Sequence, residues 1–264
     1  METVSITALH TWTPKLFSIR TTRPKGYRFT AGQWARLGVR NIARFEDDNK
    51  SCEPVWRAYS IVSSPYDDYL EFYSIVVPNG AFTSQLSKLQ VGDTLQLDPQ
   101  SFGFLTTARF QGGTDLWMLS TGTGLAPFLS ILNDPSTWEN YNTLILVHGV
   151  REANEQAYVR EIAALQNVEH PIFGEHIAEG KQLIYVPVVS REPQFTGLRG
   201  RIPELIANGE LEKKTAVTLD LAHSRIMICG NPEMVGDTRA VLKKRGFTVS
   251  RNAAPGQIAV ENYW

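Results

Sequence analysis

The stretch that decides the fold of this chain is Leu116-Trp-Met-Leu-Ser-Thr-Gly-Thr-Gly-Leu-Ala-Pro127. Its apolar half predicts a buried strand, and the glycine-rich half predicts a tight turn into a helix that begins near Pro127, because proline suits a first helical turn. Glycines in such a turn let the backbone approach a diphosphate, whose charge is stabilised by N–H groups at the helix N-terminus. A plain strand-to-helix turn uses the same residues, so the motif alone leaves both interpretations open.

Strands alternate with longer amphipathic stretches on the C-terminal side of Gln111-Gly-Gly113. The apolar runs at 116–120, 144–148, 183–189 and 225–229 are typical of buried strands. Strands and helices at this spacing predict a parallel sheet with right-handed crossovers. The C-terminal part is therefore expected to be an α/β domain.

The N-terminal part shows a different pattern. Residues 4–97 are short strand-like runs broken by Gly, Pro, Asn and Asp, and polar and apolar residues alternate over 69–77. A helix is expected after Asn79-Gly80, and a strand over 91–97. The pattern predicts a small antiparallel β-barrel, so we expect two domains, a barrel over residues 1–110 and an α/β domain over residues 111–264.

Composition narrows the class of protein. A chain of 264 residues, 42% of them hydrophobic, can bury two cores, and its net charge of -1 argues against binding to nucleic acid. Residues 1–57 nevertheless carry ten Lys and Arg against five Asp and Glu, so the front of the chain is basic. No apolar stretch is long enough to cross a membrane and the N-terminus lacks the order of a signal peptide, so a cytoplasmic protein is expected.

Cysteine usage excludes some forms of redox chemistry. Cys52 and Cys229 are the only cysteines of the chain, too few for an ordinary iron–sulfur cluster or a cysteine-based zinc site. No metal site is expected. If this protein moves electrons, an organic cofactor carries them.

Arginines follow the ends of the predicted parallel strands. Arg151 comes directly after Val150, Arg191 after Ser190, and Arg201 a little later. Ligands bind at the carboxyl ends of such strands, and an arginine there suits the 2′-phosphate of NADP rather than the free ribose of NAD. Any one of them could be a surface charge, but together they predict a phosphate clamp.

The fourth strand ends in Cys229-Gly-Asn-Pro-Glu-Met234, which is again a strand-to-helix junction. Gly230 leaves room for a flat ring against the backbone, and Cys229 could line that pocket or could simply belong to the core. In the barrel, Arg57-Ala-Tyr-Ser60 places Arg57 and Tyr59 on one face of a strand, where one could hold a diphosphate and the other could stack on a ring.

Five motifs occur together in one order: Arg57-Ala-Tyr-Ser60, Gly80-Ala-Phe-Thr-Ser84, Gly122-Thr-Gly-Leu-Ala-Pro127, Cys229-Gly-Asn-Pro-Glu-Met234 and Val260-Glu-Asn-Tyr-Trp264. In order and spacing the chain resembles the bacterial ferredoxin/flavodoxin–NADP reductases over nearly its whole length. The resemblance implies a barrel that binds FAD, an α/β domain that binds NADP, and exchange of electrons between NADPH and a ferredoxin or flavodoxin. The basic charge of residues 1–57 predicts that this carrier is acidic. A monomer is expected.

The resemblance also implies roles for individual residues. FAD would be bound by Arg57, Ala58, Tyr59, Ser60, Tyr73, Ser74, Ile75, Ala81, Phe82, Thr83, Thr123, Tyr263 and Trp264. NADP would be bound by Gly122, Gly124, Val150, Arg151, Ser190, Arg191, Arg201, Gly230 and Asn231. The candidates for residues around hydride transfer are Ser60, Cys229 and Glu261.

The C-terminus and two departures complete the comparison with that pattern. A chain that ends on two aromatics needs a docking place for them, and the resemblance puts Tyr263 over one flavin face and Trp264 on the adenine. Residues 43–54 form a polar loop longer than the pattern needs, and Ala81-Phe82 stand where a smaller or aliphatic pair is expected.

Other functions remain open from sequence. The reductase component of an oxygenase system, a general NADPH:flavin reductase (diaphorase), and a flavin-binding regulatory module without turnover would share these features.

Overall fold

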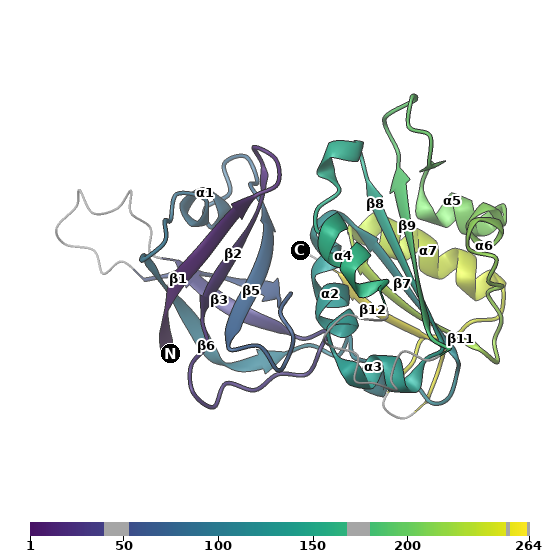
Figure 1. The fold of residues 1–264 in the computed structure, drawn as a ribbon, viewed down its shortest axis with the longest axis horizontal. Helices are drawn as coiled ribbons and strands as arrows, with labels where there is room; N and C mark the ends of the chain where they lie inside the picture. Colours follow the sequence, from purple (N-terminus) through teal and green to yellow (C-terminus); the bar gives the residue numbers. More distant parts are fainter. Residues whose placement is uncertain (40–52, 168–179, 252–253, 263–264) are drawn as a thin grey trace.

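The protein folds around two sheets that follow one another along the chain (Figure 1). The structure is a computed structural model and describes residues 1–39, 53–167, 180–251 and 254–262. The first sheet has six antiparallel strands and the second has six parallel strands. The predicted order of an antiparallel barrel followed by an α/β part is confirmed.

The first sheet closes into a barrel. Its strands are β1 (Glu2–Thr11), β2 (Leu16–Thr22), β3 (Trp34–Val39), β4 (Val55–Ser60), β5 (Tyr69–Ile75) and β6 (Thr94–Phe102), in the order β4-β3-β6-β1-β2-β5. A bridge between Ile61 and Phe72 joins the two outer strands. Alternate residues such as Ile6, Leu37 and Phe72 fill the interior. The short helix α1 (Thr83–Leu86) adds Leu86 to that core.

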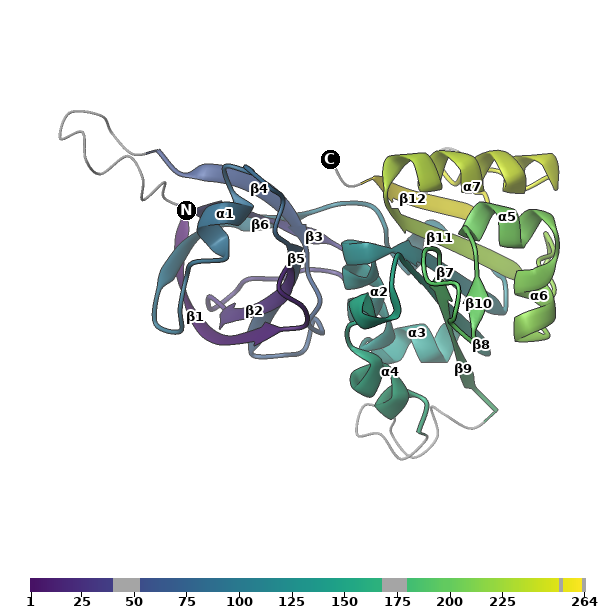
Figure 2. The ribbon, with the colours of Figure 1, turned by 90° about the horizontal axis from the view of Figure 1, so that it is seen from above.

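The second sheet is covered by helices on both faces, as Figure 2 shows. Its strands are β7 (Asp115–Thr121), β8 (Thr143–Val150), β9 (Gln182–Val189), β10 (Leu198–Arg199), β11 (Ser224–Gly230) and β12 (Ile258–Asn262), in the order β10-β9-β8-β7-β11-β12. One face carries α2 (Ala126–Leu132), α3 (Pro135–Asn140) and α4 (Val159–Leu165). The other carries α5 (Ile202–Ala207), α6 (Glu210–Thr215) and α7 (Pro232–Lys244).

Side-chain alternation along β7 explains the two layers. Leu116 and Met118 pack with α2, α3 and α4, whereas Trp117 and Leu119 pack with α5, α6 and α7. Because both faces are buried, the strand reads as a continuous apolar run. The strands on the two sides of β7 differ in chain order, so the sheet has its switch point between β7 and β11, where ligands of such folds bind.

One sequence prediction about strands needs correction. The strand expected over 91–97 begins only at Thr94, because Gly92 adopts φ +98° within a turn that Asp93 closes by bonding the backbone of Gln90. A strand that the sequence pattern did not indicate is β12 (Ile258–Asn262), which pairs in parallel with β11.

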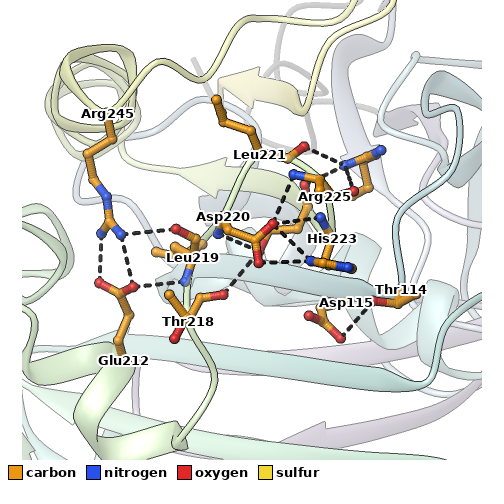
Figure 3. A network of polar contacts seen from close by, with 12 residues as sticks. Thr114, Asp115, Glu212, Thr218, Leu219, Asp220, Leu221, His223, Arg225 and Arg245 are labelled. Atoms are coloured by element: carbon orange, nitrogen blue, oxygen red, sulfur yellow. Dashed lines mark hydrogen bonds and ion pairs between the residues drawn. The ribbon is translucent and has the colours of Figure 1, made fainter.

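Arg225 fixes the connection between the two sheets at the base of the parallel sheet, and Figure 3 shows its contact with the turn before β11. The buried Arg225 guanidinium donates twice to the Gln111 carbonyl, at 3.1 and 2.7 Å, and also to the Leu221, Ala222 and Ser224 carbonyls. The N–H groups of Thr114 and Asp115 donate to the His223 carbonyl. We propose the domain boundary at 110/111, just before this anchored segment.

A second polar contact in Figure 3 closes the same end of the sheet. Arg245 donates to both carboxylate oxygens of Glu212, at 2.7 and 2.9 Å, and lowers the pKa of that carboxyl. Glu212 in turn accepts the Leu219 N–H at 2.8 Å. In the described part of the chain, no helix is both long enough and apolar enough to span a membrane.

Candidate functional site

A cleft of about 510 Å³ opens at the carboxyl ends of the parallel strands. Leu16 and Ile75 of the barrel form one wall, and the loops that follow the parallel strands form the other. Among the residues predicted for NADP, the cleft is lined by Gly122, Val150, Arg151, Ser190, Arg191, Arg201, Gly230 and Asn231. Thr123, predicted near the flavin, lines it as well. The structure thus brings together residues that are up to 109 positions apart, from Gly122 to Asn231.

Backbone hydrogen bonds hold two of the three arginines side by side. Just beyond β8 and β9, Ser190 N–H donates to the Val150 carbonyl at 3.0 Å, and Arg191 N–H donates to the Arg151 carbonyl at 2.8 Å. The Ser190 hydroxyl donates to the same Val150 carbonyl. These main-chain bonds hold the backbones of Arg151 and Arg191 next to each other, so both arginine side chains start from the same edge of the sheet.

The glycines at the switch point allow two loops to touch. A Cβ on Gly124 would clash with the Cys229 carbonyl, and a Cβ on Gly230 would clash with Thr121. Gly230 also has φ +142°. Gly122, by contrast, has φ +54° and faces open space in the cleft. Gly124 therefore serves the packing between the loops, whereas Gly122 leaves the room that a ligand needs.

Cys229 does not line the cleft. Its side chain is fully buried in the core cluster that contains Leu125 and Ala126, and its carbonyl faces Gly124. The interpretation of Cys229 as a core residue, left open by the sequence, is the one that its burial favours.

A buried histidine that no sequence motif indicated lies beneath the glycine loop. His148 Nε2 hydrogen-bonds the Gly122 carbonyl at 3.1 Å. Full burial lowers the pKa of His148 to about 4, so the ring is neutral near pH 7. A neutral ring with a proton on Nε2 donates to that carbonyl and holds the turn open toward the cleft. The Thr121 hydroxyl, which accepts the Asn231 N–H at 3.1 Å, has a similar bracing role.

Acidic residues that were not predicted from sequence share the cleft with the arginines. The acids that line the cleft are Glu155, Glu204, Glu233 and Asp237. Glu155 accepts the Arg151 N–H at 2.9 Å and so shapes the arginine loop. Glu233 lies 3.9 Å from the exposed Arg201 guanidinium. The position of Glu155, four residues after Arg151, was the available signal in the sequence.

On the barrel side, the predicted flavin residues gather at the ends of β4 and β5. The Tyr59 hydroxyl hydrogen-bonds the Ser74 hydroxyl at 2.9 Å, and burial raises the pKa of Tyr59 to about 12. Its ring lies 5.3 Å from that of Phe82. Arg57 and Ala58 are exposed one step earlier on β4, whereas Tyr73 is buried and Ile75 lines the cleft.

The turn before α1 offers free backbone donors. Within the part of the chain that the structure describes, the N–H groups of Ala81, Phe82 and Thr83 have no hydrogen-bond acceptor. The Phe82 side chain is buried in the barrel core, and the Thr83 hydroxyl is bonded to the backbone of Val77. What this turn presents to a ligand is therefore its backbone, and the departure at Ala81-Phe82 is explained by packing on Tyr59.

Ser60 and Glu261 meet where the barrel faces β12. The Ser60 hydroxyl donates to Glu261 Oε1 at 3.3 Å. A Cβ on Gly103, which has φ +102°, would lie 3.1 Å from Glu261 Oε2. Burial raises the pKa of Glu261 to about 7, against the smaller opposing effect of the Ser60 hydrogen bond. Tyr263 and Trp264, like residues 43–52 of the polar loop, lie outside the described residues.

Comparison with known proteins agrees with this geometry. The family described as "Oxidoreductase NAD-binding domain" matches residues 118–240. The chain is 41% identical to the ferredoxin–NADP reductase of Pseudomonas aeruginosa, covering 99% of this chain and 96% of that protein. It is 38% identical to the flavodoxin/ferredoxin–NADP reductase of Escherichia coli, covering 99% and 98%.

A solved structure is similar over the whole length. The ferredoxin NADP⁺ reductase of Neisseria gonorrhoeae, whose crystal structure holds FAD and NADP, superposes with a TM-score of 0.87 at 39% identity. The match covers 100% of this chain and 98% of that one. Identity at this level over nearly full length means that the chain belongs to the ferredoxin/flavodoxin–NADP reductase family.

Proposed function

We propose that this protein is a flavoenzyme that binds FAD on the barrel and NADP(H) in the cleft, and that it exchanges electrons between NADPH and ferredoxin or flavodoxin. The observation that carries the proposal is the cleft itself, which three arginines of the parallel-sheet part line together with Ile75 of β5. A bound FAD supplies the conversion between two-electron hydride chemistry and one-electron carrier chemistry.

In this proposal the arginines bind the adenosine 2′-phosphate. Arg151 and Arg191 leave the sheet edge side by side, and Arg201 lies on the same cleft wall. Charge-assisted hydrogen bonds from guanidinium to phosphate are stronger than neutral ones. The acids Glu233 and Asp237 in the same cleft oppose that charge, so the clamp holds the nucleotide without binding every anion strongly.

The residues of the barrel fit FAD. Arg57 is exposed and has no carboxylate partner within the described ranges, and the N–H groups at 81–83 are free, so both can meet a diphosphate. Tyr59, braced by Ser74, can present a ring edge or face to the flavin. The Tyr73 hydroxyl is buried without a hydrogen-bond partner in the described structure, which is the kind of atom that a ligand satisfies.

Ser60 and Glu261 would lie beside the reacting atoms. Because its pKa is raised to about 7, Glu261 can hold a proton on a carboxyl oxygen at neutral pH and exchange it readily. Ser60 orients that carboxyl from β4. The flavin-binding roles predicted for Tyr263 and Trp264 stay predictions, because both residues lie outside the described part of the chain.

We propose that the one-electron carrier is acidic. The excess of basic residues in positions 1–57 would attract such a partner and speed its encounter with the barrel. We also propose that the enzyme acts as a monomer, since the cleft is completed by residues of one chain.

The test begins with the purified protein, which is expected to carry about one extractable FAD per chain. Anaerobic NADPH should bleach the flavin, and added ferredoxin or flavodoxin should reoxidise it. Extraction of FMN, or of no flavin, would refute the proposal. Reoxidation by free flavin or oxygen alone, with no response to either carrier, would favour a diaphorase instead.

The arginine clamp is tested by affinity. Arg151→Ala and Arg191→Ala should each weaken NADP⁺ binding by about 10-fold to 100-fold, the effect of losing one charge-assisted contact of roughly 1.5–3 kcal/mol. Arg160→Ala is the matched control, because Arg160 is exposed on α4 and is not part of the cleft lining. Full discrimination between NADPH and NADH in both cleft variants would contradict the assignment.

A further inference from the structure

A chain of polar contacts, centred on the buried Glu71 and Tyr158, joins the barrel to the parallel-sheet part. The Tyr158 hydroxyl donates to Glu71 Oε1 at 2.8 Å, and Arg20 Nε donates to Glu71 Oε2 at 2.7 Å. Glu71 and Tyr158 are both almost fully buried. We refer to Arg20, Glu71 and Tyr158 as the interface triad.

The backbone of Glu71 is tied across the same interface. Its N–H donates to the Ser63 hydroxyl at 3.1 Å, and the Ser63 carbonyl accepts the Ser130 hydroxyl of α2 at 2.8 Å. Figure 2 shows α2 on the side of the parallel-sheet part that is nearest to the barrel. Arg20 therefore holds the side chain of Glu71 and Ser63 holds its backbone, in addition to the bond from Tyr158.

Tyr158 is held in an uncommon backbone conformation. It stands just before α4 with φ +59° and ψ +20°, a region that residues with a bulky side chain rarely occupy. Its ring centroid lies 4.5 Å from that of Trp12 and 5.4 Å, edge-on, from that of Tyr73. Such a conformation persists where surrounding contacts fix it, and it is found often at functional sites.

The interface triad lies between two segments that line the cleft. Tyr158 closes the loop that begins at Arg151 and includes Glu155, and both of those residues line the cleft. Glu71 lies on β5, four residues before Ile75, which lines the opposite wall. The hydrogen bond between Tyr158 and Glu71 therefore connects the nucleotide side of the cleft to the flavin side.

We propose that Tyr158 and Glu71 are positioning residues that set the distance and orientation between the two halves of the cleft. The inference rests on the proposed function. The affinity for a nucleotide that contacts only the arginines should not depend on the hydrogen bond between Tyr158 and Glu71. The rate of hydride transfer from a dinucleotide that must also reach the flavin side should depend on it, because small errors in the placement of reacting groups lower rates steeply.

The variant that tests this is Tyr158→Phe, which keeps the ring packed on Trp12 and Tyr73 and removes only the hydroxyl. Hydride transfer from NADPH in stopped-flow should be slower by about 10-fold or more, since a misplacement of about 1 Å can cost about 100-fold. The affinity for adenosine 2′,5′-bisphosphate, measured by calorimetry, should stay within about twofold. FAD content and the unfolding temperature are measured alongside, to show that the variant is folded.

Tyr185→Phe is the matched control. In the described structure the buried Tyr185 hydroxyl has no hydrogen-bond partner, and its ring packs against the same core cluster as Tyr158. Removing that hydroxyl should leave both the hydride-transfer rate and the affinity for the bisphosphate unchanged. An equal loss in the two Tyr→Phe variants would show a general packing effect and would overturn the proposal.

Glu71→Gln provides a second route. The amide keeps an oxygen that can accept the Tyr158 bond but loses the charge that faces Arg20, so an intermediate loss of rate is expected. In the double variant with Tyr158→Phe, the rate should fall no more than about twofold below that of Tyr158→Phe, because the bond across the interface is already absent and the change at Glu71 has nothing further to weaken there. Losses that multiply would show that the residues act separately and would overturn the positioning role.

The remaining outcomes separate this proposal from the function on which it rests. If the wild-type protein does not bind adenosine 2′,5′-bisphosphate, the proposed function fails and the positioning role fails with it. If the wild type binds the bisphosphate and Tyr158→Phe transfers hydride at the wild-type rate, the positioning role alone is refuted. If bisphosphate affinity and rate fall together, the triad shapes only the arginine loop, which also refutes it.

Discussion

Glu261 makes the stability of this protein depend on pH in a calculable way. The carboxyl lies beside Ser60 and Gly103 at the junction of barrel and β12, and burial raises its pKa from 4.5 to about 7. Between these two pH values the folded protein holds a proton that the unfolded chain has released. Stability therefore falls as pH rises through this window, and the contribution of the protonated carboxyl is lost above pH 7.

The magnitude follows from the same two values. At about 1.4 kcal/mol for each pKa unit, the rise from 4.5 to about 7 corresponds to about 3 kcal/mol. Glu261→Gln cannot ionise, so its stability lacks this contribution to the pH dependence. The free energy of unfolding of the wild type, minus that of Glu261→Gln, should fall by about 3 kcal/mol between pH 4.5 and pH 8.

The assay is urea unfolding of the FAD-bound protein at several pH values across that range. Glu161→Gln, which alters an exposed carboxylate on α4, is the control for the substitution itself. Infrared difference spectra of wild type and Glu261→Gln give a second reading, since a protonated carboxyl has its own carbonyl stretch. Curves for wild type and Glu261→Gln that run parallel from pH 4.5 to pH 8 would refute the reasoning.

Three further predictions concern packing, bracing and docking. Gly124→Ala should destabilise the protein by about 1–3 kcal/mol, because the added methyl group would meet the Cys229 carbonyl. Gly236→Ala lies in open space within α7 and should stabilise the protein by about 1 kcal/mol. Thermal unfolding of both variants measures the difference. Tyr59→Phe should cost about 1 kcal/mol in chemical unfolding, since it removes the hydrogen bond to Ser74, and an unchanged midpoint would count against that bond. The rate of carrier reduction should drop as salt rises, and a flat salt profile would contradict docking by charge.

Much of the parallel sheet could be predicted from sequence because its strands are buried on both faces. The apolar runs at 116–120 and 225–229 fall inside β7 and β11, within one residue at each end. Arg151 and Arg191 could be predicted as neighbours for a similar reason, since the carboxyl ends of adjacent parallel strands meet at one edge. In these cases the order of residues along the chain is enough to predict which strands are buried and which strand ends lie next to each other.

The features that could not be predicted depend on contacts between distant segments. Glu233 and Asp237 reach the cleft only because α7 begins at the switch point and turns that side toward it. Tyr158 and Glu71 are 87 positions apart and meet across the two sheets. The burial of Cys229 likewise depends on how closely Gly124 lets the neighbouring loop approach.

The anchoring of the connecting segment by Arg225 has a consequence for recombination between relatives. Arg225, the second residue of β11, donates from its guanidinium to the Gln111 carbonyl, and Gly113 lies close against the same side chain. A hybrid protein that joins this barrel to a foreign nucleotide domain after residue 110 takes both partners of this contact from the donor, whereas a junction after residue 113 would separate Gln111 from Arg225. Residues 111–113 and 221–225 should therefore be exchanged together between relatives, although more than a hundred residues separate the two segments in the chain.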